Sequence, residues 1–271
     1  MTRRRISGTV APLEKLFEII HEDAELLVIN KPADLVCHPS KNGEMSSLIG
    51  RVRLHLGTDA HPHMVNRLDR ETSGVTMVAK TDEAARALRQ LWEKREVQKE
   101  YLAIVHGHVR DDAGRIDAPL GKDEYSRVAI KDCVRRDGAA AQTEFAVVRR
   151  FNRMGAPVSD PASSGNVSLQ AGPEAGAPFT LLRVLPRTGR KHQIRIHLAH
   201  LGHPIVGDKI YGADEDLYLA LVEGRLTEEQ RARLIFPNHA LHAAAVRFEW
   251  AGQPAEFSSA PEKWFGEFAA A

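Results

Sequence analysis

Segments with strand character outnumber helical segments along this chain, and they arrive in clusters instead of alternating strictly with helices. Apolar and β-branched runs bounded by turn residues predict strands over residues 17–20, 25–30, 75–79, 99–105, 142–151, 179–185 and 243–250. Helical spacing predicts helices over 82–95 and 191–201, and Thr227 with Gln230 makes the capping box of a short third helix. This order predicts the α+β class, with a mixed, largely antiparallel sheet and flanking helices.

Size and charge place the chain among ordinary globular proteins. Its 271 residues are enough to bury a real core. The net charge of +1 provides no overall basic footprint, so any surface for nucleic acid must be local. Two distant cysteines and the absence of a long apolar run predict a cytoplasmic protein without a membrane segment. A monomer is the default expectation.

A long segment without positive charge separates two of the predicted strands. Residues 154–178 are rich in Gly, Pro, Ala and Ser and contain no Lys or Arg. We expect a mobile loop insertion here and not a linker between domains, because the strands on either side belong together. The same lack of cations makes the segment a poor candidate for binding phosphates.

One carboxylate, Asp69, stands between Arg67 and Arg70, just before a Thr-Ser-Gly turn and a buried-type strand. A solvated loop of mixed charges is the simplest explanation, and such a loop contributes little to stability. The rigid turn and the strand favour a positioned carboxylate, and positioned carboxylates are often catalytic. A neighbouring guanidinium would lower the pKa of this carboxyl and keep it ionised.

A second charged segment precedes and opens the helix expected over residues 191–201. Four cations gather there, at Arg187, Arg190, Lys191 and Arg195. Positive charge in the first turn opposes the helix dipole, and a phosphate backbone or a buried carboxylate would offset that cost. A solvated basic face is the alternative, but Gln193 and Arg195 stand next to the core positions of the helix and not opposite them.

Tyrosine and histidine provide weaker signals. Tyr101 opens an alternating strand, and from the residues alone it is expected to be a core residue with its hydroxyl at the rim. Histidines crowd residues 192–203, but no HExxH pattern and no cysteine pair accompanies them, so we expect structural histidines and no metal. No Walker loop and no GxGxxG occurs, which leaves a nucleotide cofactor without support.

Five blocks taken together resemble a known family. They are RLDRETSG at 67–74, KEY at 99–101, GRKHQIR at 189–195, GHPIVGD at 202–208 with YG at 211–212, and LHA at 241–243. In this order they resemble the pseudouridine synthases of the RluA-like class, over residues from about 22 to about 261. The resemblance implies a short extension over 1–21 and one catalytic domain over 22–271, with a central RNA-binding cleft.

The resemblance also implies an activity and a set of site residues. It implies an enzyme that isomerises a uridine in RNA, such as an rRNA or tRNA stem-loop, to pseudouridine without cofactor or metal. Asp69 matches the family's catalytic aspartate, Tyr101 the tyrosine that packs against uracil, and Arg195 the arginine that pairs with the aspartate. Asp69 then acts either on the anomeric carbon of the sugar or as a base that leads to a glycal.

RNA contacts are expected from the cations around these blocks. The guanidinium of Arg67 would occupy the position in the stack of RNA bases that the flipped base vacates. The remaining expected RNA contacts are Arg70, Arg187, Arg190, Lys191 and Gln193. Two other functions stay open: a retaining glycosidase, for which Glu71 is a poor second carboxylate, and a catalytically silent RNA-binding protein on the same fold. Asn66 stands where many relatives have histidine.

Overall fold

The computed structural model describes residues 17–38, 44–57, 59–154, 156, 176–212 and 214–270. The first 16 residues of the expected extension, and residues 155 and 157–175 of the loop expected over 154–178, lie outside this description. Its strands are β1 (Glu18–Glu22), β2 (Leu26–Lys31), β3 (His63–Met64), β4 (Ser73–Ala79), β5 (Gln98–His106), β6 (Ala113–Asp117), β7 (Leu120–Lys122), β8 (Asp132–Val134), β9 (Gln142–Arg153), β10 (Ala177–Pro186), β11 (Leu241–Trp250) and β12 (Gln253–Ser258). Its helices are α1 (Leu48–Leu56), α2 (Asp82–Glu93), α3 (Gln193–His200), α4 (Asp216–Val222), α5 (Glu228–Leu234) and α6 (Lys263–Ala270), besides a 3-10 turn at Glu44–Ser46.

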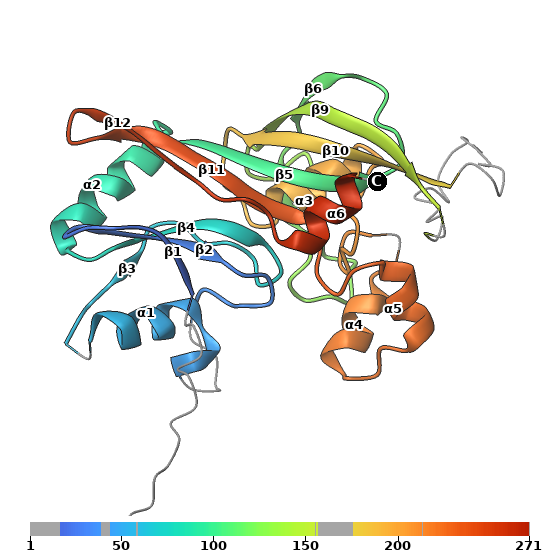
Figure 1. The fold of residues 1–271 in the computed structure, drawn as a ribbon. Coiled ribbons are helices and arrows are strands. Elements are labelled where there is room, and N and C mark those ends of the chain that lie inside the picture. Colours follow the sequence, from blue (N-terminus) through green and yellow to red (C-terminus); the bar gives the residue numbers. More distant parts are fainter. Residues whose placement is uncertain are drawn as a thin grey trace, which may run out of the picture.

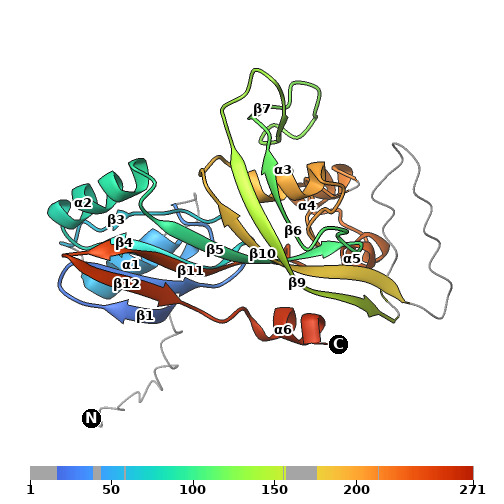
Figure 2. The same ribbon diagram turned by 90° about the horizontal axis from the view of Figure 1, so that it is seen from above.

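A ten-stranded sheet organises the molecule, in the order β1-β2-β4-β11-β5-β10-β9-β6, with β12 on β11 and β3 on β4. Of its pairings in the described residues, only β4 with β11 is parallel. The predicted α+β class with a mixed, largely antiparallel sheet is therefore confirmed. Helices α1 and α2 lie beside the half of the sheet that holds β1 to β4, and α3, α4 and α5 lie beside the half that holds β9 and β10 (Figures 1 and 2).

The parallel pair joins the two halves through one close approach. Gly74, the second residue of β4, has a φ of +113° and lies opposite Ala243 of β11. A Cβ at this position would come within 2.2 Å of the Ala243 carbonyl oxygen, so a side chain cannot fit there. All seven residues of β4 are buried, which agrees with the buried strand expected over 75–79.

The predicted elements with strong local patterns are confirmed close to their expected bounds. Thr81 caps α2 through the backbone N–H of Ala84, and Thr227 and Gln230 form the capping box of α5. The strand pair expected over 142–151 and 179–185 is the antiparallel pair β9 and β10. Short elements such as α1, β7 and β8 have no strong pattern of their own and were not expected.

Helix α3 differs from the prediction. It begins at Gln193, and His192 precedes it in the left-handed conformation with a φ of 54°. Lys191 therefore lies outside the helix, and the expected opposition between its charge and the helix dipole does not arise. All residues from 193 to 198 are buried, whereas Leu201, expected on the core face, is 39% exposed. The first six residues of the helix are therefore enclosed by neighbouring elements, whereas its last residue, His200, is exposed.

Candidate active site

Asp69 and Arg195 form an ion pair between two segments that lie far apart in the sequence. Asp69 lies on the loop between β3 and β4, and Arg195 lies in the first turn of α3. Nη1 of Arg195 donates to Oδ2 of Asp69 over 2.8 Å. The Asp69 side chain keeps 29% of its surface exposed, whereas that of Arg195 keeps 6%. The ion pair therefore presents its carboxylate to solvent and its guanidinium to the interior.

A second carboxylate, from Asp208, holds the other side of the guanidinium. Its two oxygens accept from Nε and Nη2 of Arg195 over 2.6 and 2.9 Å. Oδ1 also accepts from the backbone N–H groups of Ile210 and Tyr211. Such bidentate contacts fix the plane of a guanidinium, so the direction in which Nη1 points at Asp69 is set by Asp208. No role had been predicted for Asp208 from the sequence.

The charges of Asp69, Asp208 and Arg195 stabilise one another in their ionised forms. Burial is the largest influence and alone would raise the pKa of both carboxyls. The charge and hydrogen bonds of Arg195, together with smaller contributions from neighbouring groups, outweigh it and hold each pKa below its ordinary value. Burial would lower the pKa of Arg195, and the two aspartates raise it instead. The cluster therefore carries two negative charges and one positive charge at neutral pH, and Asp69 is ionised.

The backbone on either side of Asp69 is held from the segment that follows β2. The fully buried Lys31 donates through Nζ to the carbonyl oxygens of Arg70, over 3.1 Å, and of Leu35. The Cys37 thiol donates to the carbonyl of Leu68 over 3.4 Å. Burial lowers the pKa of Lys31 to about 8. These contacts fix both neighbours of Asp69, so a surface-loop interpretation of the stretch no longer applies.

Glu71 belongs to a separate buried network. Both of its carboxylate oxygens accept from Nζ of Lys209, over 2.8 and 2.9 Å, and Oε2 also accepts from the backbone N–H of His239. His239 in turn lies 2.7 Å from the Thr72 hydroxyl. Because Lys209 occupies both oxygens, Glu71 is not free to act as the second carboxylate of a glycosidase.

Aromatic and imidazole groups complete the site. The Tyr211 ring lies 5.0 Å from the Arg195 guanidinium carbon, and its hydroxyl is 2.8 Å from Nδ1 of His192. His192 approaches Asp69 no closer than 3.8 Å, and burial lowers its pKa, so it is neutral at pH 7. Burial and then the charge of Asp69 raise the pKa of Tyr101, whose phenol therefore stays protonated.

The residues expected to contact RNA have different surroundings. Arg67 is exposed, and Arg70 is paired with Asp34 at the surface. Arg187 pairs with Glu144, Lys191 with Asp132, and Nε of Arg190 donates to the Ala140 carbonyl. All of these cations keep part of their surface open to solvent.

Gln193, also expected to contact RNA, is held by contacts inside the protein. Its side chain is buried, its Oε1 accepts from Thr188 and from the backbone of Arg190, and its Nε2 donates to Gln142 and Thr143. Every polar atom of the amide is thus used inside the protein, which argues against the predicted RNA contact. Gln193 instead ties the loop before α3 to β9. The spacing next to core positions indicated this burial, and the RNA contact of Gln193 stays a prediction that its internal hydrogen bonds do not favour.

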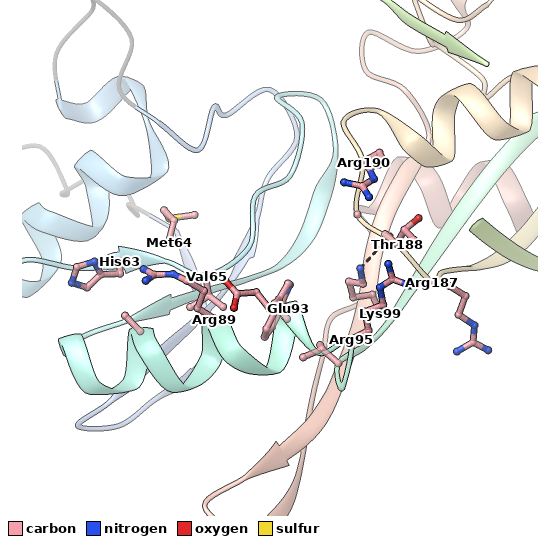
Figure 3. A pocket seen from close by; sticks show the side chains of 14 residues that line it. His63, Met64, Val65, Arg89, Glu93, Arg95, Lys99, Arg187, Thr188 and Arg190 are labelled. Atoms are coloured by element: carbon pink, nitrogen blue, oxygen red, sulfur yellow. Dashed lines mark hydrogen bonds between the residues drawn. The ribbon is translucent and has the colours of Figure 1, made fainter. Parts of the chain in front are cut away.

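A basic pocket of about 360 Å³ lies beside the site, and we name it the α2 groove. Figure 3 shows residues of β3 and α2 on one side, and Lys99 with the loop before α3 on the other. Its lining residues are His63, Met64, Val65, Ala85, Arg89, Trp92, Glu93, Arg95, Val97, Lys99, Arg187, Thr188, Gly189 and Arg190. Asp69 is not among them, so the groove does not contain the carboxylate.

Two structural features are absent from the described residues. No group of three or more His, Cys, Asp or Glu side chains in them could hold a metal ion. None of the helices within the described ranges is both long and apolar enough to cross a membrane. Histidines in the crowded segment have protein partners: the buried His197 lies within hydrogen-bond distance of Thr143 and of the Ala118 carbonyl.

Comparison with known proteins assigns the class. The sequence model of the family described as RNA pseudouridylate synthase matches residues 25–200. The chain therefore belongs to the RNA pseudouridylate synthase family, as its resemblance to the RluA-like class predicted. The human RNA pseudouridylate synthase domain-containing protein 1 shares the fold, with a TM-score of 0.66 and 22% identity over 93% of this chain and 86% of that protein.

Two bacterial relatives illustrate the range of the family. The tRNA pseudouridine synthase C of Haemophilus ducreyi is 36% identical over 85% of this chain and 84% of its own length. The dual-specificity RNA pseudouridine synthase RluA of Vibrio vulnificus is 37% identical over 74% of this chain and 71% of its own. The chain spans 58% to 66% of the length of four further relatives.

Proposed function

We propose that this protein converts a uridine in structured RNA, rRNA or tRNA, to pseudouridine, with Asp69 acting on the ribose. One observation carries the proposal: in a member of this family, a solvent-facing carboxylate accepts a hydrogen bond from a buried guanidinium that a second carboxylate holds in place. This arrangement supplies a preorganised anion, and preorganised charge is a large source of catalytic power.

The reaction breaks the bond between ribose and uracil nitrogen, turns the base and rejoins it through carbon. An ionised Asp69 can attack the anomeric carbon, or abstract a sugar proton to form a glycal. Both routes require the carboxylate form, which the lowered pKa of Asp69 provides at neutral pH. The engaged Glu71 disfavours a glycosidase, because hydrolysis with retention needs a second free carboxylate about 5 Å away.

Tyr101 would hold the uracil after the bond breaks. Its raised pKa means that it meets the base as a neutral phenol, which can pack against the ring and donate a hydrogen bond. The buried site disfavours the tyrosinate form of Tyr101. We therefore do not expect a tyrosinate to remove the proton from the uracil carbon at the end of the reaction. A phenylalanine at this position would keep the packing and lose the hydroxyl.

The target base must leave its helix before Asp69 can reach the sugar, at a cost of a few kcal/mol. Arg67 is exposed two residues before Asp69, and a planar guanidinium can stack in the vacated position. Arg70, Arg187, Arg190 and Lys191 are partly open cations that would contact phosphates. We no longer assign Gln193 to this group.

The test uses RNA with tritium at carbon five of uridine, taken from cells that lack this protein. Purified wild type and Asp69→Asn are added, and tritium released to water is counted. We expect release by wild type and background release by the variant, with equal RNA retention. If wild type binds RNA but releases no tritium from any RNA, the protein is a catalytically silent RNA-binding protein. Free uracil among the products would identify a glycosidase instead.

A further inference from the structure

The α2 groove gathers positive charge, and only part of that charge is paired with acids of the protein. Of the charged side chains among its described lining residues, Glu93 is the one acid, whereas Arg89, Arg95, Lys99, Arg187 and Arg190 are cations. Within the described part of the chain, Arg89, Arg95 and Lys99 make no ion pair. A groove built in this way attracts anions.

Lys99 and Arg95 show the crowding most directly. The one hydrogen bond that the described residues offer the Lys99 side chain runs from Nζ to the Thr188 carbonyl, over 3.3 Å. Burial lowers the pKa of Lys99, and the nearby charge of Arg95 lowers it further. Two cations held together without a counter-ion repel each other, and an anion bound between them would remove that cost.

The groove leads into the candidate active site along three segments. Lys99 stands two residues before Tyr101 on β5, so the two side chains share a face of the strand. The loop of residues 187–190 runs directly into α3, which carries Arg195. Residues 63–65 precede Arg67 and Asp69. A polymer that presents one nucleotide to Asp69 would therefore pass through the groove with its neighbouring nucleotides.

The lining also favours a nucleic acid strand over a small anion. Trp92 and Val65 contribute apolar surface beside the cations (Figure 3 shows Val65 next to Arg89). Single-stranded RNA presents both phosphates and flat bases, and grooves that combine cations with an aromatic residue suit it. A bare phosphate ion would use the cations alone.

We infer that the α2 groove binds the phosphodiester backbone of the RNA strand that flanks the target uridine, with Arg95 and Lys99 sharing one phosphate and Arg89 meeting a second. This inference rests on the proposed function for the identity of the nucleotide at Asp69. It adds α2 and the first residues of β5 to the RNA-binding surface, which the cations expected around Asp69 and α3 did not include.

The test measures binding of a fluorescent oligouridine of about 12 nucleotides to the whole protein, at several salt concentrations between about 50 and 200 mM. The variants are Arg95→Gln, Lys99→Gln and Arg89→Gln. Arg86→Gln is the matched control, because Arg86 is an exposed arginine of the same helix, paired with Glu83 and outside the groove. Thermal melting verifies that each variant is folded.

We expect each groove variant to raise the Kd about fivefold. The log–log salt slope should fall by about 0.7 in Arg89→Gln, the value for one phosphate of a single strand, and by a smaller amount in Arg95→Gln and in Lys99→Gln, which share a phosphate. Arg86→Gln should change neither quantity. In the tritium assay the groove variants should raise KM and leave the rate at saturating RNA unchanged. Wild-type Kd and slope in both Arg95→Gln and Lys99→Gln would overturn the inference.

Two further arms separate the possible outcomes. Inorganic phosphate that displaces the oligouridine at an equal concentration of phosphate groups would identify a small-anion site and reject the strand. Tritium release by wild type, together with normal binding by the groove variants, would reject the groove and keep the proposed function. Weakened binding by those variants without any tritium release by wild type would reject the function and keep an RNA-binding groove.

Discussion

At the scale of single residues, the fully buried Asp208 decides how Arg195 is aimed. We predict that Asp208→Asn lowers the free energy of unfolding by about 3–5 kcal/mol, because it removes the anion that compensates a buried guanidinium. Tritium release should fall close to background, since Nη1 of Arg195 then loses its fixed direction toward Asp69. Urea denaturation and the tritium assay measure the two effects.

A matched control exists at the surface, where Asp137 makes the same kind of bidentate pair with Arg135, over 2.6 and 2.7 Å. Asp137 is 70% exposed, and a solvated pair contributes little. Asp137→Asn should therefore leave the free energy of unfolding nearly unchanged. Equal effects of the two substitutions would contradict the role given to Asp208.

At the scale of elements, the parallel contact between β4 and β11 depends on Gly74. We predict that Gly74→Ala destabilises the fold by more than about 3 kcal/mol, because a Cβ would meet backbone atoms of Ala243 in addition to the cost of a positive φ. Gly57→Ala is the comparison, since Gly57 also has a positive φ of 101° but no atom within 4 Å of a Cβ. Its cost should be about 1 kcal/mol. Similar melting temperatures for the two variants would be inconsistent with the close approach.

At the scale of the whole molecule, several histidines are held neutral in the interior. Burial lowers the pKa of His106 to about 4 and that of His239 to about 3. Both values lie below that of the unfolded chain, so the folded state is favoured above pH 6.5 and loses stability as the pH falls. Between pH 7 and pH 5 each residue should cost about 2 kcal/mol.

Urea midpoints at pH 7 and pH 5 measure this dependence directly. His106→Gln should reduce it by about the share of one histidine. A midpoint of the wild type that is the same at both pH values would show that these imidazoles are protonated in the folded state or that water reaches them.

The sequence predicted those features that depend on neighbours along the chain. Helix α2 and its cap at Thr81, the capping box of α5 and the strands β4, β9 and β10 all follow from periodicity and local hydrogen bonding, which act over a few residues. The place of Asp69 before a rigid turn could be recognised for the same reason. These interactions form between residues of one segment, so the sequence of that segment is enough to predict them.

Tertiary structure alone decided the contacts between distant segments. Three contacts illustrate this: Asp208 with Arg195, Lys31 with the carbonyl next to Asp69, and Lys209 with Glu71. In each case the sequence of one segment gives no indication that the other segment is its partner. Gln193 and α3 show the same limit, because a polar residue becomes buried only when partners such as Thr143 arrive from another strand. Burial makes the difference: it removes water, and each buried charge then requires a partner that only the fold can supply.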